Sequence, residues 1–241
     1  MAPADSPVEQ APVPSRVQVV IWPALMLFII AYVEAVCFLG LFQTLTGYIS
    51  GATILLAAEF FRDDGNFRSK ILVLVTFVPG TFFWLMLKEH LSGWRYFVTM
   101  LFTLEAVLLM IFMGLAIHLS PLVSANATAT MLIVAISVFA MALHNVHSLQ
   151  VMPEKAKIAI TALFISFASS TVHLCALLRT SQPTAEAAAS FRALLYPLLA
   201  FFVGAFLGAF AYMSFGFAAL ASPIAILLAL AINSVCGSTR G

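Results

Sequence analysis

Five ionisable side chains lie inside long apolar stretches of the sequence, and they are the first candidates for chemistry. They are Glu34, Glu59, Glu105, His144 and His173. An acidic side chain at the centre of a membrane-spanning helix costs about 2.5–3.5 kcal/mol on insertion scales. Such a residue is therefore usually paired, neutralised or turned toward water, and each of the five is a candidate for binding a proton or a polar solute.

Glu34 and His144 occupy matching places in two similar segments, AYVEAV (31–36) and MALHNV (141–146). If the segments are related by a pseudo-two-fold axis, the carboxylate and the imidazole can face each other and exchange a proton. Asn145 adds a further polar group beside His144. The alternative is structural, because both side chains could instead bond to backbone carbonyls and brace contacts between helices.

The other ionisable residues support weaker predictions. Glu105, in FTLEAVLLM, is either a second acidic site or a protonated carboxyl group bonded to a neighbouring helix. His173 lies among serines and threonines, which is typical of a helix facing the bundle interior or a wet cavity. Glu59 precedes Arg62 by three residues and is expected to form a pair with it at a helix end.

Two Thr-containing pairs, Thr46–Gly47 and Thr161–Ala162, begin the two least apolar segments. A glycine beside a threonine permits a break in a helix, which frees backbone groups to line a cavity. A discontinuous helix at a midplane site is one interpretation, and a tight hairpin is the other. The predicted substrate or proton site comprises Glu34, Thr46, Gly47, His144, Asn145 and Thr161, with Glu105 and His173 as secondary candidates.

The composition places these residues in a lipid bilayer. The chain has 241 residues, of which 63% are hydrophobic and 9% are charged. Soluble domains average roughly 45–50% apolar and about 25% charged residues, so this chain has too little polar surface for a water-soluble enzyme. A net charge of +1 offers no basic surface to nucleic acid. The expected partners are the bilayer and an unknown small solute, with self-association left open.

After Arg16 the chain divides into eight apolar blocks separated by short polar connectors. A helix needs about 20 residues to cross the hydrocarbon core, and 44–61 and 156–178 are the weakest candidates. The fold class is therefore an all-α membrane bundle, preceded by a disordered tail at 1–16 and followed by a short tail at 237–241. The blocks are 17–42, 44–61, 70–90, 94–119, 124–148, 156–178, 191–213 and 216–236.

Three pairs of similar segments occur in the same order along the chain. Two are described above, and the third sets FVPGTFFW (77–84) over FFVGAFLG (201–208). They predict two homologous halves, 17–119 and 124–236, each with four blocks. Four crossings in each half would make the repeats parallel, whereas three would make them inverted. Gly204 and Gly208 form a small-residue face that predicts close packing of helices.

Lysine and arginine are retained in short cytoplasmic loops, so their placement predicts orientation. Whether six or eight blocks cross the membrane, more lysines and arginines lie on the side of the N-terminus than on the other side. The sequence therefore predicts a multi-pass protein of the bacterial inner membrane with both termini in the cytoplasm.

Signatures of catalysis are absent from the sequence. It contains no H-E-x-x-H, G-x-S-x-G, phosphate loop or G-x-G-x-x-G. Its histidines have no cysteine or carboxylate at ligand spacing, so neither a metal nor another cofactor is expected. The chain is therefore expected not to be an enzyme.

Several of these segments together resemble the YoaK-like family of bacterial multi-spanning membrane proteins, itself a domain of unknown function. They are AYVEAVCFLGLF, TLTGYISG, LEAVLLM, MALHNV and FFVGAFLGAF leading into YMSFGFAAL. The family's acidic-Ala pair corresponds to Glu34–Ala35, and its Thr-Gly pairs correspond to Thr46–Gly47 and Thr161–Ala162. Its Gln-Asn pair is His144–Asn145, which retains only the Asn and is typical of a divergent member. The resemblance implies a helical membrane protein and no particular substrate.

Two functions are compatible with these features. The first is a small secondary transporter or permease, with a polar midplane site between two halves and with Glu34 or His144 as candidates for proton exchange. The second is a non-transporting protein that acts as an assembly factor or as a subunit of a larger membrane complex.

Overall fold

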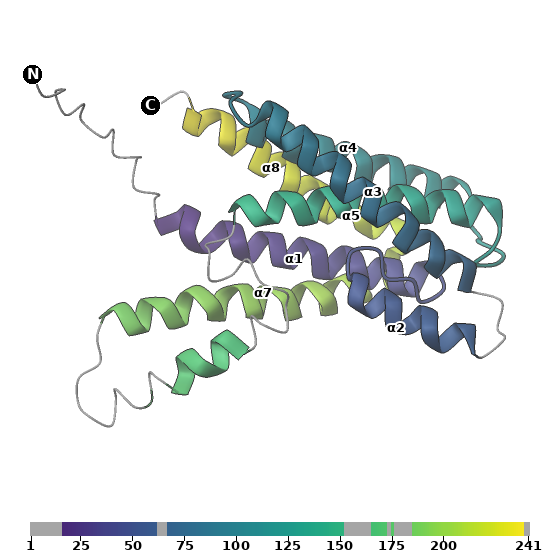
Figure 1. The fold of residues 1–241 in the computed structure, drawn as a ribbon, viewed down its shortest axis with the longest axis horizontal. Coiled ribbons are helices and arrows are strands. Elements are labelled where there is room, and N and C mark those ends of the chain that lie inside the picture. Colours follow the sequence, from purple (N-terminus) through teal and green to yellow (C-terminus); the bar gives the residue numbers. More distant parts are fainter. Residues whose placement is uncertain (1–15, 62–66, 152–164, 173–174, 176–184, 239–241) are drawn as a thin grey trace, which may run out of the picture.

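The computed structural model describes residues 16–61, 67–151, 165–172, 175 and 185–238. Helices account for most of these residues, and no strand occurs among them, so the predicted all-α class is confirmed. The elements are α1 (Arg16–Gly40), α2 (Ile49–Phe60), α3 (Phe67–Leu91), α4 (Phe97–His118), α5 (Thr128–Val151), α7 (Ala185–Phe215), the 3₁₀ turn η2 (Gly216–Leu220) and α8 (Ala221–Ser238) (Figure 1).

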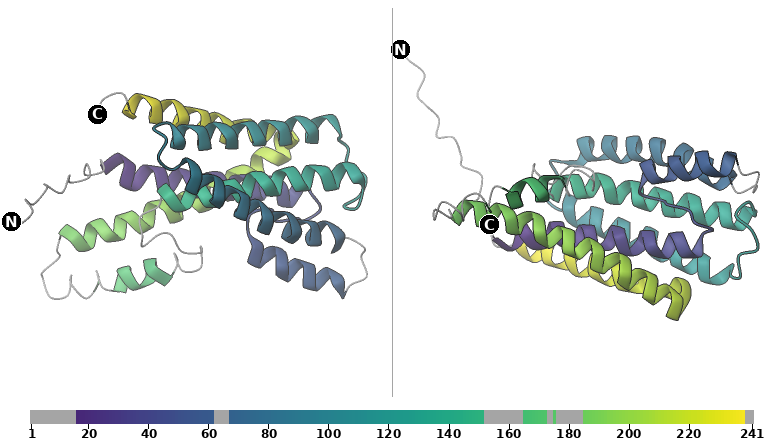
Figure 2. Two further views of the ribbon diagram at one scale, coloured as in Figure 1. Left: turned by 45° about the horizontal axis from the view of Figure 1, so that its top comes forward. Right: turned by 90° about the horizontal axis from the view of Figure 1, so that it is seen from below.

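Five stretches of the described residues are long and apolar enough to cross a membrane. The last of them, Phe191–Val235, contains parts of both α7 and α8. The chain reverses between these helices at Gly216, whose φ of +57° suits a residue without a side chain. Because α8 runs back beside the bundle (Figures 1 and 2), this stretch provides two helices rather than one.

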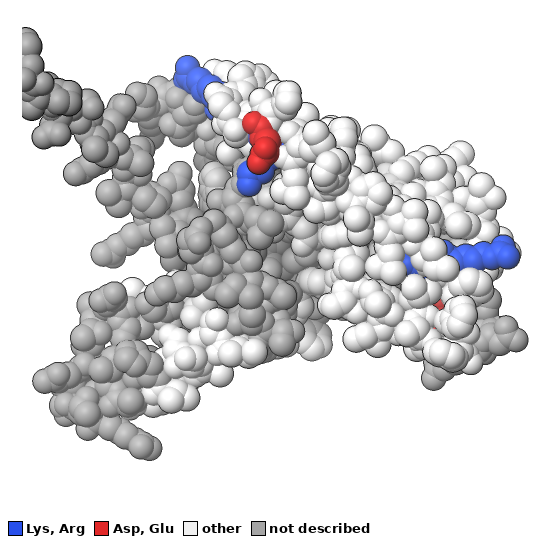
Figure 3. Space-filling view, viewed as in Figure 1, with Lys and Arg blue, Asp and Glu red and all other residues white. Residues whose placement is uncertain are grey.

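The outer surface of the bundle matches a lipid environment. Large apolar side chains are exposed along the outer helices, among them Phe82 on α3 and Phe206 and Phe210 on α7. On the face drawn in Figure 3, charged side chains lie toward the two ends, and the surface between them is uncharged. Exposed apolar area of this extent is rare on soluble monomers and marks a membrane or protein contact.

The second predicted block forms a helix that is too short to cross. With a rise of about 1.5 Å per residue, the 12 residues of α2 extend over roughly 18 Å, against a hydrocarbon core of about 30 Å. The chain turns back after α1, and α2 then runs toward the end of the bundle where α3 begins (Figure 1). α2 is therefore a re-entrant helix, which enters and leaves the bundle at the same end.

The corresponding block of the second half, 156–178, lies largely outside the described residues. Residues 165–172 are helical, whereas Thr161 and His173 lie outside the described ranges. The two residues stay predictions, as does the division into two halves. Of the predicted tail at 1–16, the structure describes only Arg16, which begins α1, and α8 extends to Ser238, into the predicted tail at 237–241.

The core is built around α1 and α5. α1 packs chiefly on α7, α3 packs on α5, and α4 packs on α8 and α5. Small residues allow the closest of these approaches: Gly204 and Gly208 lie directly against the backbone of Phe28 and Tyr32 in α1. A Cβ atom at Gly208 would lie 2.5 Å from the carbonyl oxygen of Tyr32. Helices in lipid associate through this kind of close packing, because burial of apolar area from water does not drive them together.

We expect Gly204→Ala to lower the free energy of unfolding by about 1–3 kcal/mol, the usual cost of overpacking. The added methyl group would contact backbone atoms of Phe28, which can yield only if α7 moves away from α1. Gly114→Ala is the matched control, because nothing lies within 4 Å of its Cβ position and alanine favours a helix. Thermal unfolding of the purified protein in detergent provides the measurement, and equal midpoints for the two variants would contradict the prediction.

Candidate functional site

The re-entrant segment begins with an unusual turn. Phe42 and Gln43 have positive φ angles of 52° and 57°, a conformation that residues with side chains rarely adopt. The backbone N–H of Gln43 donates to the carbonyl oxygen of Phe38 at 2.9 Å, which ties the turn to the last turns of α1. Such strain persists only where the surrounding structure holds it. The turn directs residues 44–48 back along α1.

Glu34, on α1, receives the returning chain. Its carboxylate accepts hydrogen bonds from the N–H and the hydroxyl of Thr46, at 3.1 Å and 2.9 Å, and from the N–H of Gly47. The side chain is only 3% exposed. These donors directly precede α2, so the carboxylate lies near the positive end of the helix dipole, where an anion is stabilised.

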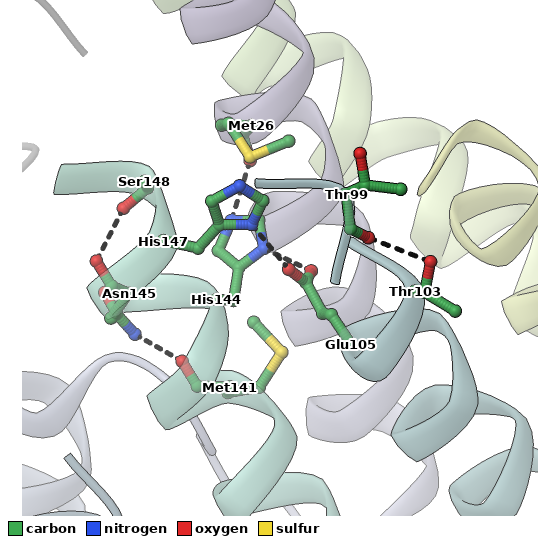
Figure 4. Close-up of polar contacts among 9 residues, drawn as sticks. All are labelled: Met26, Thr99, Thr103, Glu105, Met141, His144, Asn145, His147 and Ser148. Carbon is green, nitrogen blue, oxygen red and sulfur yellow. Dashed lines mark hydrogen bonds and ion pairs between the residues drawn. The ribbon is translucent and has the colours of Figure 1, made fainter. Parts of the chain in front are cut away.

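Gly47 is held between this carboxylate and α5. A Cβ atom there would lie 3.0 Å from Oε1 of Glu34 and 3.3 Å from Cβ of Met141, so the position favours glycine. The amide of Asn145 donates to the carbonyl oxygen of Gly47 at 3.4 Å. It also donates to the carbonyl oxygen of Met141 at 2.9 Å (Figure 4). The structure thus brings together four of the predicted site residues, which we call the Glu34 cluster: Glu34, Thr46, Gly47 and Asn145.

Lys70, on α3, binds the other side of the same turn. Its ammonium group donates to the carbonyl oxygen of Phe42 at 2.6 Å and to the hydroxyl of Thr44 at 3.1 Å. It also forms an ion pair with Glu59 on α2, at 3.3 Å. Lys70 is 1% exposed, so its charge is neutralised within the protein.

Glu59 forms an ion pair with Lys70, which was not predicted. The expected pairing of Glu59 with Arg62 stays a prediction, because Arg62 lies outside the described residues. Sequence reasoning missed this role of Lys70, because spacing along one helix says nothing about a partner on the next helix. The available signal was a lysine at the start of an apolar block, directly after a short charged connector.

His144 does not pair with Glu34. Its Nδ1 lies 2.6 Å from Oε1 of Glu105 on α4, and its Nε2 lies 3.1 Å from the carbonyl oxygen of Met26 on α1 (Figure 4). Both ring nitrogens are therefore occupied, and the predicted direct pair is wrong. The physical reason is that α4 packs against α5 at this level and presents a carboxylate closer to the imidazole.

Glu105 joins two histidines rather than one. Its Oε2 lies 3.4 Å from Nδ1 of His147, one turn along α5 from His144, and residues three apart share a helix face. Glu105 and His144 are each 1% exposed and His147 is fully buried. We call these three residues the Glu105 cluster. His147 is not among the predicted site residues, although its spacing of three residues from His144 indicates that the two side chains share a helix face.

The two clusters are adjacent because α5 contributes to both. Asn145 belongs to the Glu34 cluster, and the preceding residue, His144, belongs to the Glu105 cluster. Within the described ranges, no group of three His, Cys, Asp or Glu side chains is arranged to hold a metal ion. The hydroxyl of Thr46 donates to Glu34 and the amide of Asn145 donates to backbone carbonyl groups, so the donors of the Glu34 cluster are bonded within the protein.

A family model for sequences described as "Protein of unknown function (DUF1275)" matches residues 23–233. The chain belongs to this family. The match begins in α1 and ends in α8, so both clusters lie within the part that defines a DUF1275 protein. No curated protein and no solved structure matches the chain.

Proposed function

We propose that this DUF1275 protein is a small secondary transporter with its solute site at the Glu34 cluster. The observation that carries the proposal is a buried carboxylate, Glu34, that holds the start of a re-entrant helix inside a membrane bundle. Ionisable groups within a membrane are costly, and they commonly mark solute or ion pathways.

The re-entrant helix supports the proposal independently. Irregular backbone at membrane depth is tolerated only where protein buries it or where it lines a cavity. In many transporters, discontinuous helices point their positive ends at an anionic group near the bilayer midplane. Here Thr46 and Gly47 present this end of α2 to Glu34. A solute with a carboxylate or similar anionic group could compete with Glu34 for the same donors.

The packing of the crossing helices supports two inverted halves. The predicted correspondence relates α1 to α5, α3 to α7 and α4 to α8. Under this relation, the contact of α1 with α7 is equivalent to that of α5 with α3, and both contacts occur. Glycines make close approaches in both: Gly204 and Gly208 against α1, and Gly80 against Phe139. Inverted halves can rock about a central site and open it to each side in turn.

We further propose an orientation in a bacterial inner membrane. The start of α1, the end of α3, the start of α4 and the start of α7 lie at one end of the bundle (Figure 1). By their positions in the sequence, Arg16, Lys88, Arg95 and Arg192 belong to these parts of the helices or directly precede them. At the opposite end, the first turn of α3 carries Arg68 and the internally paired Lys70. The excess of basic residues favours the cytoplasm for the side with the N-terminus, and α8 returns the C-terminus to that side.

The function is tested by measuring solute flux in proteoliposomes that contain the purified chain. We expect uptake of at least one member of a panel of small carboxylates, amino acids and cations, with protein-free liposomes as the control. An imposed pH gradient should change the rate. Absence of flux for the whole panel, together with stoichiometric co-purification of another membrane protein, would contradict transport and favour a role in assembly.

A further inference from the structure

We propose that the Glu105 cluster is the proton-binding site of this protein and that Nε2 of His147 is the atom that takes up the proton. The inference rests on the proposed transport function and deepens it, because it names the coupling ion and separates its site from the Glu34 cluster. It stands on the hydrogen-bond geometry of three buried side chains, Glu105, His144 and His147.

The geometry around His144 determines how many protons it shares. The carbonyl oxygen of Met26 can only accept a hydrogen bond, so Nε2 of His144 must carry a hydrogen. The 2.6 Å contact between Nδ1 and Oε1 of Glu105 then holds one proton, on the nitrogen or on the oxygen. With either placement, His144 and Glu105 together carry no net charge.

The number of protons on the His144–Glu105 pair also determines the protonation state of His147. The single proton of that pair lies between Nδ1 of His144 and Oε1 of Glu105. Oε2 of Glu105 therefore carries no proton and can only accept a hydrogen bond. Nδ1 of His147 therefore carries a hydrogen and points it at Oε2, at a distance of 3.4 Å. A neutral imidazole has one N–H, so Nε2 of His147 presents an unprotonated lone pair.

Nε2 of His147 is buried and has no hydrogen-bond partner among the described residues. Buried polar atoms are nearly always partnered, so an exception calls for an explanation. The ring of Phe102 packs edge-on against the imidazole with 4.1 Å between centroids, and both side chains are fully buried. We read this arrangement as the closed, unloaded state of a site that fills when the packing of Phe102 opens.

The described groups around the cluster are acidic or apolar. α4 contributes the carboxyl group of Glu105, which lies against His147. α1 contributes Glu34, which holds Gly47, the partner of Asn145 on α5. On α3, Leu87 and Leu91 pack in the same apolar cluster as Val146 of α5. Glu105 is therefore the charged partner that the structure places on His147.

The loading step is simple in chemical terms. A hydronium ion in the water on the open side gives its proton to the lone pair of His147 Nε2. One O–H bond of the hydronium breaks, an N–H bond forms, a water molecule leaves, and the charge of the cluster rises by one. Glu105, bonded to Nδ1 of the same ring, stabilises the imidazolium that forms. Release to water on the other side reverses the step. The result is one proton carried per cycle.

His147→Asn tests the proposal with little change in shape. The asparagine amide nitrogen can take the place of Nδ1 and still donate to Glu105, but no group remains at the Nε2 position. We expect the variant to insert normally and to conduct solute downhill, while a pH gradient no longer accelerates the flux. His90→Asn is the matched control, because His90 is an exposed histidine near the end of α3, and it should retain the full response.

A second measurement detects proton binding at His147 without requiring transport. ¹⁵N-histidine NMR spectra of the purified protein are recorded between about pH 5 and 9, the range in which imidazole groups titrate. We expect the Nε2 signal of one ring to change as that nitrogen binds a proton, and we expect this titrating signal to be missing from His147→Asn. A His147 ring that keeps one protonation state throughout would overturn the proposal. So would an undiminished response to pH gradients in His147→Asn, which would leave transport itself intact. Titration of His147 without any flux would support the proton site and contradict the transport function.

Discussion

Lys70→Met is expected to lower the free energy of unfolding by about 3–5 kcal/mol, the usual cost of removing one partner of a buried ion pair. Lys70 neutralises Glu59 and also donates to the carbonyl oxygen of Phe42. Its loss would leave a carboxylate unpaired and a strained turn without its anchor on α3. Methionine has a similar length, so the effect reports the charge and the hydrogen bonds rather than a cavity.

The measurement is chemical or thermal unfolding in detergent, combined with hydrogen exchange over residues 41–48. Arg68→Met is the matched control, because Arg68 is exposed two residues away on α3, and surface substitutions usually change stability by at most about 0.5 kcal/mol. Adding Glu59→Gln to Lys70→Met should restore part of the loss by removing the unpaired charge. Equal stability of the two single variants would show that Lys70 does not hold the turn.

Glu34→Gln is expected to abolish solute flux while the protein still inserts into the membrane. A glutamine can accept hydrogen bonds through one oxygen, but its NH₂ group would face the N–H of Thr46, which is also a donor. The mismatch is expected to cost about 1–3 kcal/mol, as for an unsatisfied buried polar group. It would also displace the start of α2, because Thr46 and Gly47 both donate to Glu34 in the wild-type protein.

Flux in proteoliposomes provides the measurement, after the amount of inserted protein has been matched between samples. Glu89→Gln is the control, because Glu89 is an exposed glutamate near the end of α3, and it should transport at the wild-type rate. Normal flux through Glu34→Gln would remove Glu34 from the solute site and leave it a structural role in holding α2.

The two clusters suggest how solute and proton binding could be linked. Asn145 contacts the backbone of Gly47, and the adjacent His144 contacts Glu105, so one turn of α5 contributes to both clusters. A small rotation or shift of α5 would therefore alter both sets of hydrogen bonds. This linkage predicts that His147→Asn and Glu34→Gln differ: the first should uncouple flux from pH, and the second should stop flux.

The sequence by itself determined the class of the protein and most of its helices. An apolar fraction of 63% with 9% charged residues permits only a membrane environment for most of the chain. The predicted blocks 17–42, 70–90 and 94–119 match α1, α3 and α4 to within a few residues. Hydropathy predicts these helices well because every backbone group in lipid must be satisfied within its own helix.

The sequence also identified most of the ionisable residues of the candidate site, but only the tertiary structure decided their partners. Glu34 binds a loop instead of His144, and His144 binds Glu105. These choices depend on how α1, α4 and α5 rotate about their axes and pack, which no short-range spacing records. The turn at Phe42 and Gln43 could not be predicted either, because neither is a glycine and Lys70, distant along the chain, holds it in place. Local patterns determine where helices form, whereas contacts between distant segments determine which buried charges meet.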